Sequence, residues 1–333
     1  MHTRQGASDT AEPGPAPETF TLTAWGDFSE FLGDLRVVAR SIGPDGAACV
    51  LAVNARDADA VHQRGLSRGG GSFAPTRTRR PYPAVAFHYD GLSVRRTELP
   101  EVPFAFPSIQ IFPTGEVLLA GARCHYTGRG PELNAALYSP EGTLLHPMTL
   151  GDGIQDVQVS SRGEIWVSYF DEGIFGNLGW NPPLGEPGLV CFGPDGHIRW
   201  KLEAPEELGP IADCYALNVA EDATWACYYL DFPVVRIAPD HTLRGWKNRV
   251  RGASALAVSS SHVLHWGGYQ DEPSRCTVQR LGAGSLTHPR DLHLRLPEGP
   301  LLSQAKVIGR GSLLHAFVGT RWYQFNVNHL PWW

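Results

Sequence analysis

The chain has 333 residues, a hydrophobic content of 42% and a formal net charge of -6 at pH 7. Two average domains would fit this length, but all-β folds of this size often form a single domain. The negative charge argues against a general nucleic-acid binder, which normally carries a basic footprint.

Residues 1–18 are rich in Pro, Ala and acidic residues and lack periodicity, so we expect a disordered tail. They also lack the apolar segment of a signal peptide, and no apolar run in the chain approaches the length of a membrane span. We therefore expect a cytoplasmic protein without membrane contact. Its folded domain is expected to cover residues 19–333 and to begin with a strand at residues 19–25.

The clearest pattern lies at residues 151–202. Residues 154–160 alternate apolar and polar side chains, residues 161–163 form a turn, and residues 164–170 are rich in β-formers. Two further strands, at 188–193 and 197–202, are joined by Pro194–Asp195–Gly196. A four-stranded antiparallel unit of about 50 residues is typical of a β-propeller blade.

Comparable units occur before and after this one. Their strands are expected at residues 36–42, 47–54, 84–89 and 92–98 in blade one; 108–112, 116–122, 134–139 and 143–149 in blade two; 214–220, 223–230, 234–238 and 242–247 in blade four; 254–259, 262–268, 275–281 and 291–296 in blade five; and 304–309, 313–318 and 322–327 in blade six. Blade six lacks one strand, and residues 19–25 would close the ring as its outer strand. We predict an all-β, single-domain propeller with six blades. Five or seven blades remain alternatives, because the strand pattern of blade five is weak in the sequence.

The repeated strand–turn–strand units carry PDG, PEG and PTG turns over nearly the whole chain after residue 18. In this the chain resembles the six-bladed propellers of the NHL, TolB-like and gluconolactonase-like kinds. For the lactonase-like enzymes, the resemblance implies a divalent metal at the channel mouth, held by carboxylates and Asn from several inner strands. Asp156 and Asn218 lie near suitable places for such a site.

Residues 56–83 interrupt blade one with six arginines and a run of three glycines. Loops of this length in a compact domain are usually functional or disordered. One interpretation is a disordered insertion. The other is a lid that counters an acidic rim or supplies anion-binding arginines.

Cysteine and histidine patterns carry no metal signature. The six cysteines share no CxxC spacing and most lie in expected strands, so we expect reduced core thiols, with one structural zinc or disulfide as the alternative. His262 and His265 lie in an expected strand and are interpreted as packed or solvated.

Propeller topology assigns the short uniform turns to one face and the long varied loops to the other, where binding residues usually lie. The long loops are acidic and aromatic. The ligand-binding candidates are Asp156, Asp171, Glu172, Asp213, Tyr215, Asp231, His125, Tyr126, Trp180 and Trp322. We expect Asp156 and at least one of Asp171 and Glu172 to converge on one site, with Asp156 and Asp171 as candidate metal ligands.

These features lead to two functional hypotheses. The first is a binding propeller that recognises a small ligand or protein partner on the acidic, aromatic face. The second is a metal-assisted hydrolase or lactonase at the channel mouth, in which Ca²⁺ or another divalent cation polarises a carbonyl and Asp156 or Asp171 acts as base.

Overall fold

The protein was analysed as a computed structural model that describes residues 17–66, 70–269, 272–301 and 304–331. The expected tail therefore lies almost wholly outside the described residues. None of the described helices is long and apolar enough to cross a membrane.

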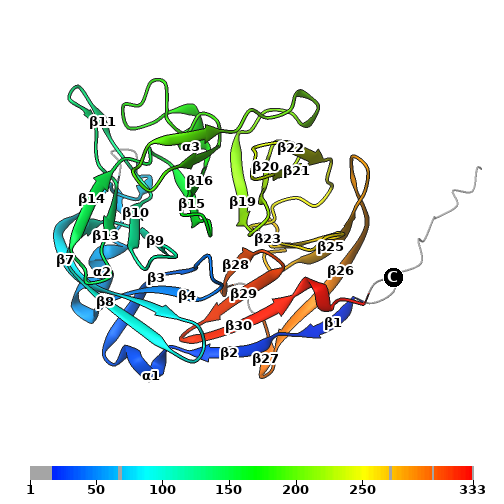
Figure 1. The fold of residues 1–333 in the computed structure, drawn as a ribbon, viewed down its shortest axis with the longest axis horizontal. Coiled ribbons are helices and arrows are strands. Elements are labelled where there is room, and N and C mark those ends of the chain that lie inside the picture. Colours follow the sequence, from blue (N-terminus) through cyan, green and yellow to red (C-terminus); the bar gives the residue numbers. More distant parts are fainter. Residues whose placement is uncertain (1–16, 67–69, 270–271, 302–303, 332–333) are drawn as a thin grey trace, which may run out of the picture.

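Six blades of four antiparallel strands surround a central axis, which confirms the six-blade prediction (Figure 1). From the axis outward, the first three blades contain β3 (Leu35–Ile42), β4 (Ala48–Asn54), β7 (Arg77–Tyr89) and β8 (Val94–Phe104); β9 (Pro107–Ile111), β10 (Val117–Gly121), β13 (Ala135–Tyr138) and β14 (Leu144–Met148); and β15 (Ile154–Val159), β16 (Ile165–Tyr169), β17 (Leu189–Phe192) and β18 (Ile198–Lys201).

The second half of the ring follows the same order. Its blades contain β19 (Asp213–Val219), β20 (Thr224–Tyr229), β21 (Val234–Ile237) and β22 (Leu243–Trp246); β23 (Ala255–Val258), β24 (His262–Trp266), β25 (Cys276–Leu281) and β26 (Leu286–Leu296), extended by β27 (Gly299–Pro300); and β28 (Lys306–Arg310), β29 (Leu313–Val318) and β30 (Arg321–Asn326). Each inner strand contacts the inner strand of the next blade, so the six inner strands line the axis.

The N-terminal segment closes the ring, which confirms the predicted closure. It is split at Leu22 into two strands that join different blades. β2 (Thr23–Asp27) pairs antiparallel with β30 and completes blade six, whereas β1 (Glu18–Thr21) pairs in parallel with β26 of blade five. Both blue strands run along the outer edge of the orange and red sheets (Figure 1).

The segment at residues 56–83 contains more secondary structure than an irregular loop. It holds most of α2 (Ala55–Val61), the short strands β5 (Gly65–Leu66) and β6 (Ser72–Phe73), and the first part of β7. β7 starts at Arg77 instead of residue 84, because Pro81 and Pro83 are accommodated by register shifts on either side of Tyr82. Val61 of α2 is fully buried in the core between blades one and two, which fixes the helix there.

Side chains of the inner strands form hydrogen bonds between blades near the short turns. The Gln158 amide donates to Leu217 O of blade four at 3.0 Å and accepts from Val219 N at 2.9 Å. Asn218 bridges to Leu256 O at 2.7 Å and accepts from Gly311 N at 2.8 Å. These residues stand near the ends of their strands, just before the short turns, so their bonds join the inner strands of blades three to six on this side of the axis.

Arg310 adds a further contact of this kind by reaching across the axis from blade six to blade three. Its guanidinium donates to the side-chain oxygen of Gln158 at 3.3 Å and to the carbonyl of Val159. Burial lowers the pKa of Arg310 to about 10, against the opposing effects of Cys49, Asp156 and Asp45. An arginine held by neutral oxygens thus joins opposite sides of the ring.

The six cysteines and His265 lie in the packed interior. All six cysteines are free and buried. His265 lies in the core with 0% exposure, and burial lowers its pKa to about 3. These residues are therefore parts of the packed interior.

The closing segment should contribute strongly to stability through Leu22. This side chain is 2% exposed and packs in the core shared by blades five and six. Leu22→Ala is expected to lower the free energy of unfolding by about 2–4 kcal/mol, because it leaves a cavity. Urea denaturation measures the loss, and the exposed neighbour Thr21→Ala is the matched control. Equal stability of the two variants would contradict closure through this segment.

Candidate functional site

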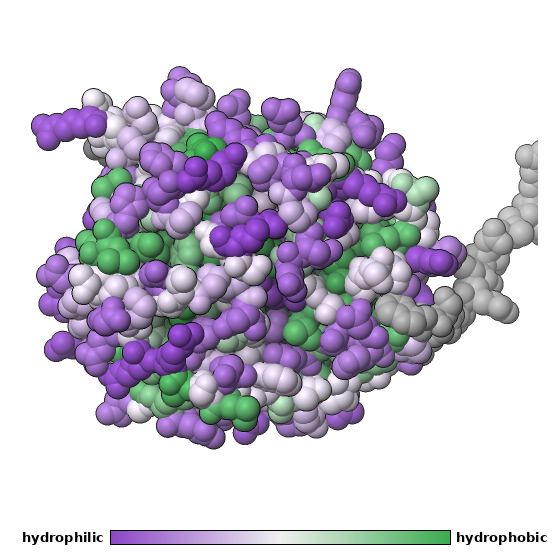
Figure 2. All heavy atoms as spheres, viewed as in Figure 1, coloured by the Kyte–Doolittle hydropathy of each residue, from purple (hydrophilic) through white to green (hydrophobic). Residues whose placement is uncertain are grey.

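The long and varied connections share one face, as expected from the topology. They join the second and third strands of each blade or lead from one blade to the next. We call this the loop face and the opposite one the short-turn face. On the face viewed in Figure 2, hydrophobic residues form small separate patches among hydrophilic ones.

A cluster of aromatic and acidic residues lies where blades three, four and five meet on the loop face. Asp213 begins inner strand β19 and is the cross-strand partner of Tyr229. The rings of Tyr215, Tyr229 and Tyr269 surround the buried ring of Phe232, with centroid distances of 5.2, 5.6 and 6.0 Å. Tyr229 and Tyr269 are 40% and 49% exposed, so the cluster has an open aromatic surface. We call these residues together with Asp171 the acidic–aromatic cluster.

The two carboxylates of this cluster repel each other. Asp171 is exposed at the start of the short helix α3 (Asp171–Phe175), and Asp213 is half-buried. Burial, followed by the charge of Asp171, raises the pKa of Asp213 to about 6. Among the described residues, neither carboxylate forms an ion pair with a basic side chain. The cluster therefore concentrates negative charge beside exposed tyrosine rings.

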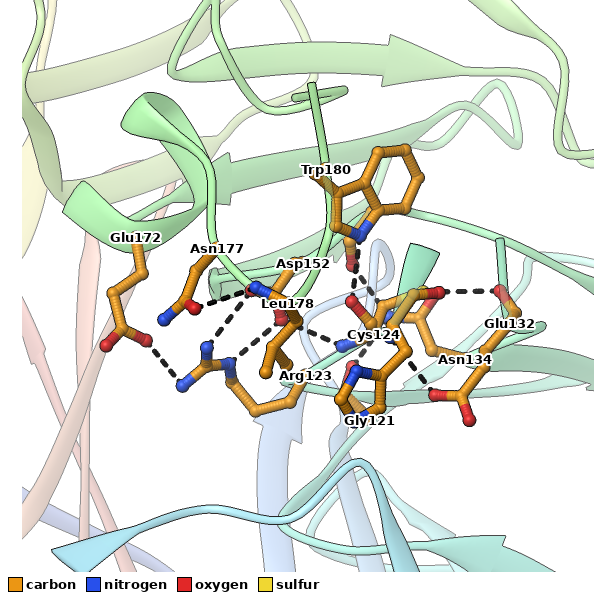
Figure 3. A network of polar contacts seen from close by, with 12 residues as sticks. Gly121, Arg123, Cys124, Glu132, Asn134, Asp152, Glu172, Asn177, Leu178 and Trp180 are labelled. Carbon is orange, nitrogen blue, oxygen red and sulfur yellow. Dashed lines mark hydrogen bonds and ion pairs between the residues drawn. The ribbon is translucent and has the colours of Figure 1, made fainter. Parts of the chain in front are cut away.

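A second group of polar contacts joins blades two and three (Figure 3). The buried Arg123 guanidinium contacts both oxygens of Asp152, at 2.9 and 3.1 Å, and also pairs with Glu172. Asp152 also accepts from the backbone N–H of Cys124 at 2.8 Å. The network fixes the position of α3, which carries Glu172 as well as Asp171.

Aromatic contacts brace the loops around this network. The Trp180 indole donates to Cys124 O at 2.8 Å, and its ring lies 5.1 Å from the ring of Tyr126. Tyr126 belongs to the small hairpin of β11 (Tyr126–Thr127) and β12 (Gly130–Pro131). Trp180 and Tyr126 thus hold neighbouring loops together at the rim.

The insertion in blade one reaches this network. A cavity of about 400 Å³ is lined by Phe73 and Arg77 from the insertion and by Arg123, His125 and Glu172 from blades two and three. The Arg77 guanidinium donates to Leu133 O at 3.1 Å. The insertion therefore forms one wall of a cavity on the loop face.

The predicted site residues separate into distinct places. Asp213, Tyr215 and Asp171 share the acidic–aromatic cluster, whereas Glu172, His125, Tyr126 and Trp180 belong to the network around Arg123. Asp231 is exposed in the β20–β21 connection and lines another cavity, of about 640 Å³, with Lys247 and Arg249.

Trp322 requires a correction. We expected it on the loop face, but it is 0% exposed. Its ring lies 6.1 Å from that of Phe317, and its indole donates to His315 Nδ1 at 3.2 Å. It packs in the core between blades six and one, because its position in β30 points it inward.

The surroundings of Asp156 do not fit the divalent-metal site that the resemblance implied. Asp156 accepts from Val157 N at 2.9 Å and from the Gln158 amide at 3.2 Å, and it lies near the cations of Lys306 and Arg310. The Asn218 oxygen is occupied by Gly311 N. No group of three or more His, Cys, Asp or Glu suited to a metal occurs within the described part of the chain. The hydrolase stays a sequence-based prediction.

Arg123 and Phe232 are the central residues that the sequence did not reveal. Arg123 stands in an expected loop, and its partner Asp152 is 29 positions away in the sequence. Phe232 sits in a tight connection, where a buried aromatic is difficult to anticipate. The one available signal was Asp152, which lies just before the first strand of the clearest repeat.

Comparisons with known proteins add the following similarities. A family model described as the YxzG family matches residues 189–270, from β17 to the connection after β24. No curated protein matches the sequence.

Three solved structures illustrate the similarity in shape. A virginiamycin B lyase from Staphylococcus aureus is 11% identical, with 88% of this chain and 95% of that chain covered and a TM-score of 0.45. A gluconolactonase from Xanthomonas campestris is 12% identical, with 95% and 99% covered and a TM-score of 0.43. Hsv2 from Kluyveromyces lactis is 12% identical, with 88% and 75% covered and a TM-score of 0.46. We draw no conclusion about activity from these similarities.

The Arg123–Asp152 pair should be important for stability. Asp152→Asn leaves a buried guanidinium without its main counter-charge, so we expect a loss of about 3 kcal/mol in the free energy of unfolding. Asp195→Asn, in an exposed pair with Arg199, is the control and should change little. Urea denaturation compares the two. Equal small effects would show that Glu172 alone satisfies Arg123.

Asp213 should destabilise the fold once it ionises. Its pKa of about 6 exceeds the value of about 3.9 expected in the unfolded chain, so stability is lost as the pH rises between these values. Asp213→Asn should therefore raise the free energy of unfolding at neutral pH by about 1 kcal/mol, after allowance for solvent screening. The gain should vanish near pH 4. Urea denaturation at both pH values tests this, with exposed Asp34→Asn as the control; a gain independent of pH would contradict it.

Proposed function

We propose that the protein is a binding propeller that recognises a positively charged group of a small ligand or protein partner at the acidic–aromatic cluster. The observation that carries this proposal is the pairing of Asp213 with Asp171, unneutralised by a described basic residue, beside the tyrosines around Phe232. A cation placed there would relieve the repulsion between the carboxylates.

The aromatic rings favour an organic cation. Ammonium and guanidinium groups are attracted to the faces of tyrosine rings, and the attraction strengthens when the site is partly desolvated. Three tyrosines stand at this rim, with Tyr229 and Tyr269 largely exposed. Their hydroxyl groups add hydrogen-bonding capacity around the charged centre.

Packing and hydrogen bonds hold the residues of the acidic–aromatic cluster in place before a ligand binds. Asp213 and Tyr215 belong to an inner strand whose far end is anchored by Asn218, and Phe232 packs at 2% exposure beneath the rings. Asn248 donates to Phe232 O at 3.0 Å and fixes the connection that carries this ring. A preformed site loses little conformational freedom on binding.

Tetramethylammonium is a suitable probe because it is a cation without hydrogen-bond donors. Titrated against sodium chloride at equal ionic strength, it should shift the NMR signals of the tyrosine rings in a saturable way. Asp213→Asn should weaken this binding by about tenfold, because the nearest full counter-charge is lost. Binding should also strengthen as the pH rises through about 6, where Asp213 ionises.

The matched control is Asp231→Asn, an exposed carboxylate on the same connection as Phe232 that lines the separate cavity with Lys247 and Arg249. It should leave tetramethylammonium binding unchanged. Absence of a saturable response in the wild-type protein, or equal losses in both variants, would overturn the proposal.

A further inference from the structure

The short-turn face carries a groove that is separate from the acidic–aromatic cluster. It has a volume of about 740 Å³ and lies between blades four and five, with its inner end at blade six. Lining residues come from the turns at residues 220–222, 259–260, 281–282 and 311–312. A cavity of this size holds a small molecule.

Two stacked indoles form the blade-four side of this groove. Trp225 and Trp246 are 5.5 Å apart with an interplanar angle of 21°, and both are almost fully buried. Trp246 donates to Gly282 O at 2.8 Å, which joins blade four to blade five. The groove therefore has a rigid floor.

Each indole carries a guanidinium on its ring. The Arg236 guanidinium lies 5.9 Å from the ring centre of Trp225, and that of Arg244 lies 4.7 Å from the ring centre of Trp246. Stacking restricts the orientation of a long side chain and leaves the N–H groups at the guanidinium edge available to a ligand.

The two arginines differ in their charge partners. Arg236 pairs with Asp222 at 3.4 Å. Besides its contact with Trp246, the Arg244 guanidinium donates to the neutral Gly282 O at 3.5 Å, and within the described ranges it has no carboxylate partner. Arg244 thus presents an oriented positive charge to the groove.

The rest of the lining is polar and supplies hydrogen bonds. Ser260 and Ser312 contribute hydroxyl groups, and Asn328 contributes a side-chain amide. Glu221 is exposed at the same groove and has no basic partner among the described residues. A ligand whose anionic group is held by Arg244 would therefore place the rest of its polar structure against these groups.

We propose that this groove binds a small polar molecule through a phosphate or carboxylate group, with Arg244 as the residue that holds the anion. Guanidinium pairs with oxyanions through parallel hydrogen bonds, which suits both groups. The site lies on the face opposite the acidic–aromatic cluster, so it does not depend on the function proposed there.

Inorganic phosphate is the probe for the full-length protein. Titrated against chloride at equal ionic strength, phosphate should shift the indole N–H signal of Trp246 in a saturable way in NMR spectra. Arg244→Gln should weaken this response by about tenfold. Arg199→Gln is the matched control, because Arg199 is an exposed arginine on blade three that is already paired with Asp195.

Glu221→Gln tests the same site in the opposite direction. It removes a carboxylate that repels an anion in the groove, so phosphate should bind more tightly, and its exposed position spares the fold. The absence of a saturable phosphate response in the wild-type protein would overturn the proposal. So would equal weakening by Arg244→Gln and Arg199→Gln, or a Glu221→Gln variant that binds phosphate no better.

Discussion

The whole ring depends on satisfying the free edges of six inner strands. Each inner strand pairs with its own blade on one side only, so its other edge presents backbone N–H and C=O groups to the axis. Gln158 and Asn218 meet this requirement by bonding to the backbone of neighbouring blades, and Arg310 crosses the channel to Val159 O. These contacts join the inner strands of blades three to six near the short turns.

Two sets of charged residues on the loop face differ in whether their charges are balanced by a partner of opposite sign. Arg123 is buried and its charge is matched by Asp152 and Glu172, so the network holds loops in place. Asp213 and Asp171 lack a comparable basic partner among the described residues. Burial and the repulsion between the two carboxylates therefore raise the pKa of Asp213. An unsatisfied charge beside exposed tyrosines is typical of a binding surface, whereas a matched charge is typical of a structural one.

Most of the fold could be predicted from the sequence because blades repeat local patterns. Turns such as Pro194–Asp195–Gly196 fix strand ends, and a missing strand in blade six indicated where the N-terminus belongs. The site was harder to predict because its contacts join distant residues. Asp213 and Tyr215, at the start of an expected inner strand, were among the candidates for the loop face, but Arg123 depends on a partner in another blade. Trp322 was expected on the loop face, but both faces of β30 are packed, with Trp322 in one core and Tyr323 in another.

The split N-terminal segment also sets the order in which the ring can be completed during synthesis. β1 and β2 leave the ribosome first, but their partners β26 and β30 are among the last strands made. Until then the ends of the growing ring keep exposed strand edges, which are sites of mispairing between chains. Blades one to five can form one after another, whereas the joint between the two ends must wait until β30 has been made. The nascent protein is therefore most exposed to aggregation just before its last blade is complete.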